Sequence, residues 1–110
     1  MKQRETTVLP YDAETAISAL SEALNACESA QEVRAFLVDL CTPAELEAMA
    51  DRWKVVPHLL LGEPYREVHE RTAVSVTTIG RVARTLERGS GGYATAARRL
   101  RLPENSGVRS

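Results

Sequence analysis

The stretch YREVHERTAVSVTTIGRVAR, residues 65–84, decides the fold of this 110-residue chain. Val68 is the apolar residue with which a first predicted helix can pack against a second helix. Val74 is the apolar residue expected to be buried in the tight turn between them. Ser75 is placed to cap a second helix, whose apolar face begins at Ile79. This register is typical of a helix-turn-helix, in which the second helix enters the major groove of DNA.

The second helix of this motif is expected to expose small residues near its start and arginines further along. The expected exposed set is Thr77, Thr78, Gly80, Arg81, Arg84 and Thr85. Small side chains allow close approach to base edges, and arginine binds guanine or phosphate. Two positions depart from the usual pattern: Ala73 stands where the turn most often has glycine, and His69 stands where a buried alanine is usual.

The charges of the chain are divided between its two halves. The net charge is −1, but residues 1–51 hold three basic and ten acidic residues, whereas residues 52–110 hold eleven basic and five acidic ones. The halves therefore carry −7 and +6. Between Val76 and Arg101 six arginines face the single carboxylate of Glu87. This asymmetry favours a polyanionic partner for the C-terminal half.

The remaining sequence predicts helices and no strands, so we expect an all-α fold of about six helices. Thr42 and Pro43 form the strongest helix start signal, and Gly62 is expected to end that helix. The expected organisation is a flexible N-terminal arm over residues 1–12, dimerisation helices over 13–62, the helix-turn-helix over 63–88, a hinge and C-terminal helix over 89–102 and a disordered tail over 103–110.

A homodimer is expected because amphipathic helices in so short a chain bury only a modest core as a monomer. The expected interface anchors are Phe36, Leu37, Leu40 and Trp53. A dimer would hold two recognition helices about one turn of DNA apart, roughly 34 Å.

Several classes of protein are excluded by the sequence. No apolar run is long enough for a membrane span, and the N-terminus lacks the apolar segment of a signal peptide. Cys27 and Cys41 have no histidine or cysteine at metal-ligand spacing, and two reduced thiols in a cytoplasmic protein explain them better than a metal site or a bridge. His58 and His69 are the only histidines and have no catalytic motif around them, so we expect no enzyme.

The segment LCTPAELEAMADRWKVVPHLLLGEPYREVHERTAVSVTTIGRVARTLERGSGGY, residues 40–93, resembles the Trp-repressor superfamily and most closely its YerC/YecD-like branch of bacterial regulators. The similarity lies in the TPAE start, the LLxG end, the YREV helix, the TTIxRV segment and the GSGGY exit. It implies an intertwined helical homodimer that binds double-stranded DNA at a palindromic operator, as a transcriptional repressor.

The resemblance also implies roles for individual residues. On the helix-turn-helix it assigns DNA contacts to Arg66, His69, Val76, Thr77, Thr78 and Gly80, to which the charge pattern adds Arg81 and Arg84. Thr42, Arg52 and Arg81 match three residues around the corepressor of tryptophan-sensing members. No metal or cofactor is expected. We expect no tight tryptophan binding, because Val82 replaces a small glycine, Trp53 and Pro57 add bulk, and the linker after Gly62 is one residue shorter.

Two alternatives remain from the residues themselves. The two-helix corner is also compatible with a helical protein–protein interaction module, in which the arginines bind an acidic protein surface and no DNA. Arg52 and Arg81 have a simpler interpretation than an effector pocket, with Arg52 in an ion pair and Arg81 on DNA.

Overall fold

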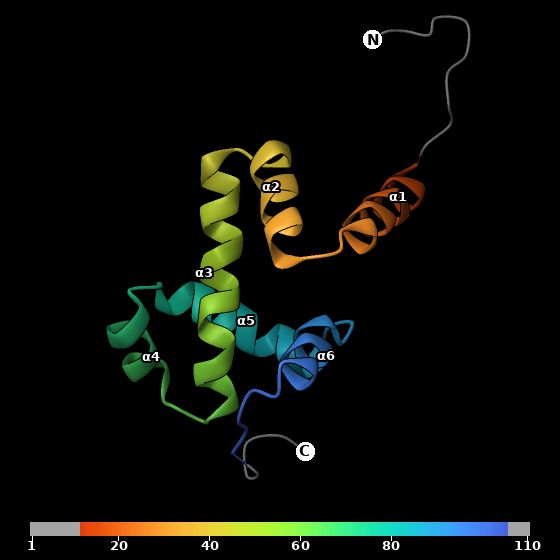
Figure 1. Cartoon of the computed structure of the whole chain (residues 1–110). Helices are drawn as coiled ribbons and strands as arrows, with labels where there is room; N and C mark the ends of the chain where they lie inside the picture. Colours follow the sequence, from red (N-terminus) through yellow and green to blue (C-terminus); the bar gives the residue numbers. More distant parts are fainter. Residues whose placement is uncertain (1–11, 106–110) are drawn as a thin grey trace, which may run out of the picture. The chain divides into compact units, whose positions relative to one another are not determined.

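The computed structural model describes residues 12–105, and every regular element among them is an α-helix (Figure 1). The all-α fold expected from the sequence is therefore confirmed, with six helices in the described part. The helices are α1 (Ala13–Ala26), α2 (Ala30–Leu40), α3 (Pro43–Leu60), α4 (Tyr65–Thr72), α5 (Val76–Arg88) and α6 (Gly92–Arg99).

The chain divides into two compact units, residues 1–42 and residues 43–110. The first contains α1 and α2, neither of which buries a single residue. The second contains α3 to α6, where α3, α4 and α5 all contact one another and α6 contacts α3. The third helix, which the sequence analysis grouped with the first two, thus belongs to the same compact unit as the helix-turn-helix.

Side-chain caps fix the starts of α1 and α2. The Asp12 carboxylate accepts the backbone N–H of Thr15 at 2.8 Å, and this hydrogen bond holds the pKa of Asp12 below its ordinary value. Ser29 caps α2 by accepting the N–H of Glu32 at 3.1 Å. Asp12, expected in a flexible arm, is therefore part of the α1 cap, while residues 1–11 of that arm lie outside the described residues.

The end of α3 is a Schellman motif built on Gly62, which has a positive φ of 80°. The N–H of Glu63 donates to the carbonyl of His58 at 3.3 Å, and the N–H of Gly62 donates to that of Leu59 at 3.0 Å. The contact that usually joins the two flanks of this motif is apolar. Here it is polar, because His58 Nδ1 and Glu63 Oε1 lie 2.9 Å apart.

The core of the second unit lies where α3, α4 and α5 meet. Its members are aliphatic side chains at helical spacing: Val55, Val56, Leu59, Leu60, Val68, Val74, Ile79, Val82 and Ala97. Full burial of each large aliphatic side chain contributes about 1.5–3 kcal/mol. Trp53 packs at the edge of this core, with its ring centroid 6.2 Å from that of Tyr93.

The C-terminal segment is more ordered than expected. Helix α6 begins at Gly92, so the non-helical link after α5 is three residues long. Arg101 follows the helix with a positive φ of 60°. Asn105, expected in a disordered tail, donates its backbone N–H to Leu60 at 2.9 Å and its side-chain amide to Leu61 at 3.3 Å. These bonds correct the expectation for Asn105.

Gly89→Ala is expected to lower the free energy of unfolding by about 1–3 kcal/mol, because overpacking forces neighbouring atoms apart. A Cβ at this position would lie 2.6 Å from the Thr85 carbonyl oxygen. Urea unfolding followed by circular dichroism measures the loss. Gly92→Ala is the matched control, since a Cβ there meets nothing within 4 Å. An equal loss in both variants would contradict the steric explanation.

Candidate DNA-binding surface

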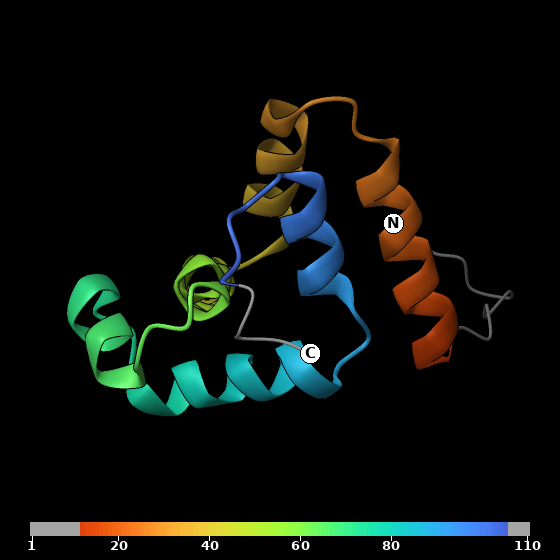
Figure 2. The same cartoon turned by 90° about the horizontal axis from the view of Figure 1, so that it is seen from below.

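Helices α4 and α5 form a corner that lies across α3 (Figure 2). Helix α4 stops at Thr72 because Ala73 adopts a left-handed conformation, with φ 65° and ψ 10°. Ser75 then starts α5 by accepting the N–H of Thr78 at 3.1 Å, and Val74 between them is buried in the core. The structure confirms the expected turn, including the positive φ that explains why glycine is usual at position 73.

The Thr72 hydroxyl joins the last turn of α4 to the turn that follows it. It donates to the carbonyl of Val68 at 2.7 Å and accepts the N–H of Val74 at 3.2 Å, and Thr72 is 7% exposed. A buried N–H without a partner is costly, so this hydroxyl stabilises the turn. The sequence analysis missed Thr72. The available signal was a threonine at a helix end, because its hydroxyl can bond a carbonyl four residues back.

His69 does not occupy the buried position that the sequence analysis assigned to it. The residue is exposed, and its Nδ1 lies 2.7 Å from the carbonyl oxygen of Val74. A carbonyl oxygen only accepts, so Nδ1 carries a hydrogen and donates it. His69 therefore braces the turn with one ring nitrogen and leaves the other ring nitrogen for an external contact.

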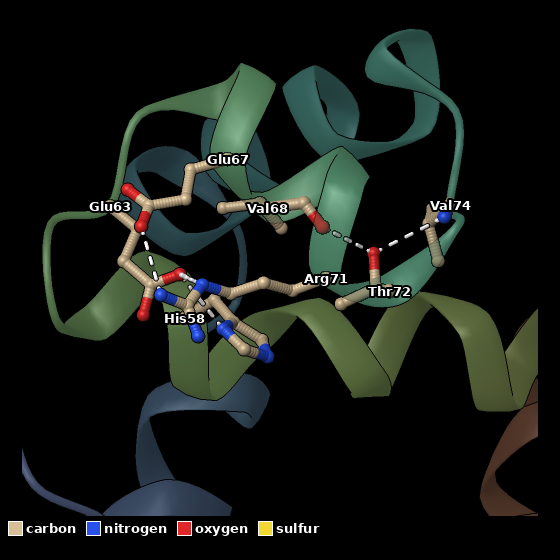
Figure 3. A network of polar contacts seen from close by, with 7 residues as sticks. All are labelled: His58, Glu63, Glu67, Val68, Arg71, Thr72 and Val74. Carbon is tan, nitrogen blue, oxygen red and sulfur yellow. Dashed lines mark hydrogen bonds and ion pairs between the residues drawn. The ribbon is translucent and has the colours of Figure 1, made fainter.

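A network of charged side chains joins the end of α3 to α4 (Figure 3). Glu63 Oε1 contacts His58 Nδ1 at 2.9 Å and Arg71 Nε at 3.5 Å, and Arg71 also donates to Glu67 Oε2 at 2.9 Å. The hydrogen bond to Glu67 and the charge of Glu63 raise the pKa of Arg71 above its ordinary value. The Arg71 guanidinium is thus paired with two carboxylates of its own chain.

The residues assigned to DNA contact lie on α4 and α5. Arg66, Thr77, Arg81 and Arg84 are exposed, Val76 is 51% exposed, and Thr78 and Gly80 are half-buried. The Thr78 hydroxyl already takes part in a hydrogen bond, which it accepts from Ser75 Oγ at 3.1 Å. Among residues 12–105, no ion pair is formed by Arg66, Arg81 or Arg84.

The residues of the expected effector pocket are divided between the two units. Arg52 on α3 and Arg81 on α5 are exposed in the second unit, whereas Thr42 ends the first. Arg52 takes part in no ion pair within the described segment, so the simpler interpretation of Arg52 as half of an ion pair is not supported. Val82 is only 1% exposed and fills the core at the position where the resemblance expects a small glycine.

The residues expected at a dimer interface differ in exposure. Leu40 is 52% exposed, while Phe36 and Leu37 are half-buried. Trp53 is half-buried and packs on the core of its own chain beside Tyr93. Further apolar side chains are exposed on α1 and α2, including Ile17 at 58% and Val38 at 52%.

Other kinds of site find no support in the described residues. Over residues 12–105 no helix is both long and apolar enough to cross a membrane. The same part of the chain holds no group of three or more histidine, cysteine or carboxylate side chains fit for a metal ion. Cys27 and Cys41 are free thiols and half-buried.

These features define a class of protein: a helical DNA-binding regulator whose helix-turn-helix presents unpaired arginines. The family model of the Trp repressor protein matches residues 15–101. The chain belongs to the Trp repressor family, whose members are DNA-binding regulators of transcription and not enzymes.

Relatives and solved structures agree with this assignment. The uncharacterized protein YerC of Bacillus subtilis strain 168 is 35% identical over 74 residues, which cover 67% of this chain and 71% of YerC. A Trp repressor candidate from Staphylococcus aureus superposes with a TM-score of 0.76 at 29% identity, covering 82% of this chain and 90% of that one. A TrpR-like protein from Eubacterium eligens superposes with a TM-score of 0.75 at 31% identity, covering 82% of this chain and 93% of that one.

Ala73→Gly is expected to raise the free energy of unfolding by about 0.5–1 kcal/mol. A left-handed alanine costs about 1–2 kcal/mol, of which the greater unfolded-state entropy of glycine offsets a part. Urea unfolding measures the change. Ala96→Gly, at an exposed site inside α6, is the control and should lower stability by about 1 kcal/mol. Destabilisation by both variants would contradict strain at position 73.

Proposed function

We propose that the chain is a transcriptional repressor that binds a palindromic operator as a homodimer, with α5 of each copy in the major groove. The observation that carries this proposal is the pairing of the arginines. Arg71 on α4 is engaged by Glu63 and Glu67, whereas Arg81 and Arg84 on α5 have no carboxylate partner within the described residues. Unpaired arginines on one exposed helix face are suited to phosphate and guanine.

The start of α5 also favours an anion. Helices α1 to α4 each carry a glutamate in the first turn, at Glu14, Glu32, Glu45 and Glu67. Helix α5 has none. The positive end of its dipole and its first backbone N–H groups are therefore not neutralised by an acidic side chain, and a DNA phosphate is favoured there. Thr77 is exposed in this first turn, where it can reach a base edge.

The proposed contacts have distinct roles. Arg66 and His69 on α4 bind the phosphate backbone and position α5. Val76, Thr77, Thr78 and Gly80 lie at the start of α5 and face the bases, while Arg81 and Arg84 follow one and two turns later. Phosphate contacts set the register on the duplex, and contacts with base edges supply sequence specificity.

A second copy of the chain is the proposed cover for the apolar side chains of the first unit. Helices α1 and α2 bury no residue, yet Ile17, Val38 and Leu40 expose half or more of their surface. Short helices without a buried face are marginal in water. We propose that Phe36, Leu37, Leu40 and Trp53 anchor the dimer, and that the symmetry of the dimer requires a palindromic operator.

The proposal places the protein in the bacterial cytoplasm, where its DNA target lies. A small-molecule corepressor at Thr42, Arg52 and Arg81 is compatible with this function, but tight tryptophan binding is not expected. The buried Val82 side chain supports that expectation, since the resemblance expects a small glycine at this position.

Arg84→Gln is expected to weaken binding to a duplex from the upstream region of its own gene by roughly tenfold, and to reduce the salt slope by about one. Fluorescence anisotropy at two salt concentrations measures both quantities. Arg71→Gln removes the same charge from α4 and should change affinity less, because Glu63 and Glu67 already offset that charge. Equal losses in the two variants, or affinity no better than for random DNA, would refute the proposed contact face.

Leu40→Glu is expected to convert the dimer to monomers, because an unpaired buried charge costs about 3 kcal/mol or more. Sedimentation velocity at micromolar concentration measures the oligomeric state. Ala35→Glu adds the same charge to an exposed residue on the opposite face of α2 and should leave the dimer intact. A wild-type chain that sediments as a monomer would overturn the proposed assembly.

A further inference from the structure

A cavity of about 580 Å³ lies on the flank of α5, inside the second unit. Its walls come from the end of α3 with its exit turn, from the first residue of α4 and from α5 between Gly80 and Arg88. The lining residues are Leu59, Gly62, Glu63, Tyr65, Gly80, Ala83, Arg84, Leu86, Glu87 and Arg88. Its volume lies within the range of small-molecule sites, roughly 300–1,000 Å³. None of Thr42, Arg52 and Arg81 lines it, so it is separate from the expected effector pocket.

The charges of this cavity favour an anion. Arg84 and Arg88 are four residues apart on α5 and form no ion pair among residues 12–105. Like charges at this spacing repel each other on a helix. Of the two carboxylates in the lining, Glu63 is already engaged by His58 and Arg71 (Figure 3). The single carboxylate of Glu87 therefore faces two free guanidinium groups.

The lining of the cavity includes a glycine, Gly80, that no contact within the chain requires. Gly80 lies inside α5, where glycine lowers helix stability relative to alanine. A Cβ at this position would meet Tyr65 Cε2 at 3.8 Å, which is an ordinary contact. Alanine would therefore fit the fold. The glycine is compatible with the proposed close approach of DNA bases, and it also leaves the space beside Tyr65 open to a small molecule.

We propose that this cavity binds a small organic anion, whose charged group pairs with Arg84 and Arg88 and whose apolar part lies against Tyr65, Leu59 and Leu86. Arginine binds carboxylate and phosphate groups through parallel hydrogen bonds, so two arginines on one flank form a suitable cradle. Mixed lining of this kind selects a ligand with one anionic end and one ring or short chain.

Binding of this anion would oppose binding of DNA. Arg84 belongs both to the cavity and to the proposed DNA face, and its guanidinium cannot serve both partners at once. A ligand that binds only the DNA-free form shifts the protein away from DNA, and DNA lowers ligand affinity by the same factor. The site would thus release the operator, as an inducer does. This regulatory step rests on the proposed function, whereas ligand binding itself does not.

In the test, the DNA-free full chain is titrated with phenyl phosphate at constant ionic strength, and binding is measured by calorimetry and NMR. Phenyl phosphate should bind more tightly than inorganic phosphate, because only the ester has a ring for the apolar lining. Arg88→Gln should weaken phenyl phosphate binding by roughly fivefold or more. Arg98→Gln, which removes the same charge from α6, should leave it unchanged. Gly80→Ala should weaken binding while stabilising the fold, a combination that a merely structural glycine would not give.

The outcomes separate this site from the alternatives. Equal weakening by Arg88→Gln and Arg98→Gln, equal affinity for the two phosphates, or no binding would overturn the proposal and indicate general attraction of anions. With labelled duplex present, saturating phenyl phosphate should weaken wild-type DNA affinity by roughly fivefold or more, and Arg88→Gln should be less sensitive. Phenyl phosphate binding without any DNA binding would instead refute the proposed function and leave the ligand site standing.

Discussion

The burial of Val74 between two helices is the constraint on which the rest of the second unit depends. Val74 is buried in the turn between α4 and α5, and it enters the core only because Ala73 adopts a left-handed conformation. The Thr72 hydroxyl then satisfies the Val74 N–H, and His69 donates to the Val74 carbonyl. The side chain, the backbone N–H and the backbone carbonyl of Val74 are therefore all held in place. The orientation of α5 on α3, and with it the exposed face that we propose to contact DNA, follows from that fixed turn.

Ion pairing separates the neutralised cations of the second unit from the arginines that we propose to contact DNA. Arg71 joins α4 to the exit turn of α3 through Glu63 and Glu67, and Lys54 pairs with Asp51 within α3. Surface pairs of this kind contribute little to stability. Their greater effect is to neutralise charge, and Arg81 and Arg84 on α5 are left without a carboxylate partner among the described residues. The cavity beside α5 uses the same arrangement, since the engagement of Glu63 leaves Arg84 and Arg88 as its free charges.

Much of the fold could be predicted because its signals are local. Ser75 as a cap, Gly62 as a left-handed end and the apolar spacing of Ile79 and Val82 depend on a few neighbouring residues, and the structure confirms them. The motif pattern placed His69 at a usually buried position and the resemblance gave it a DNA contact, and the structure leaves the residue exposed, because the packing of α4 against α5 decides which of its side chains are buried. The role of Thr72 was not predicted, because its hydroxyl accepts the N–H of Val74 only when Ala73 takes its left-handed conformation.

The sequence by itself determined the helices, the Ser75 cap, the acidic and basic halves and the family, because hydrogen-bond chemistry and helical periodicity act within a few residues of the chain. Tertiary structure alone decided that Arg71 has a second carboxylate beyond Glu67 of its own helix, since Glu63 reaches Arg71 only after α4 folds back beside the end of α3. It also decided that Gly80, Arg84 and Arg88 share a cavity with Leu59 and Tyr65. Such sites arise from the packing of separate elements, and no spacing within one helix encodes the residues that another helix brings beside it.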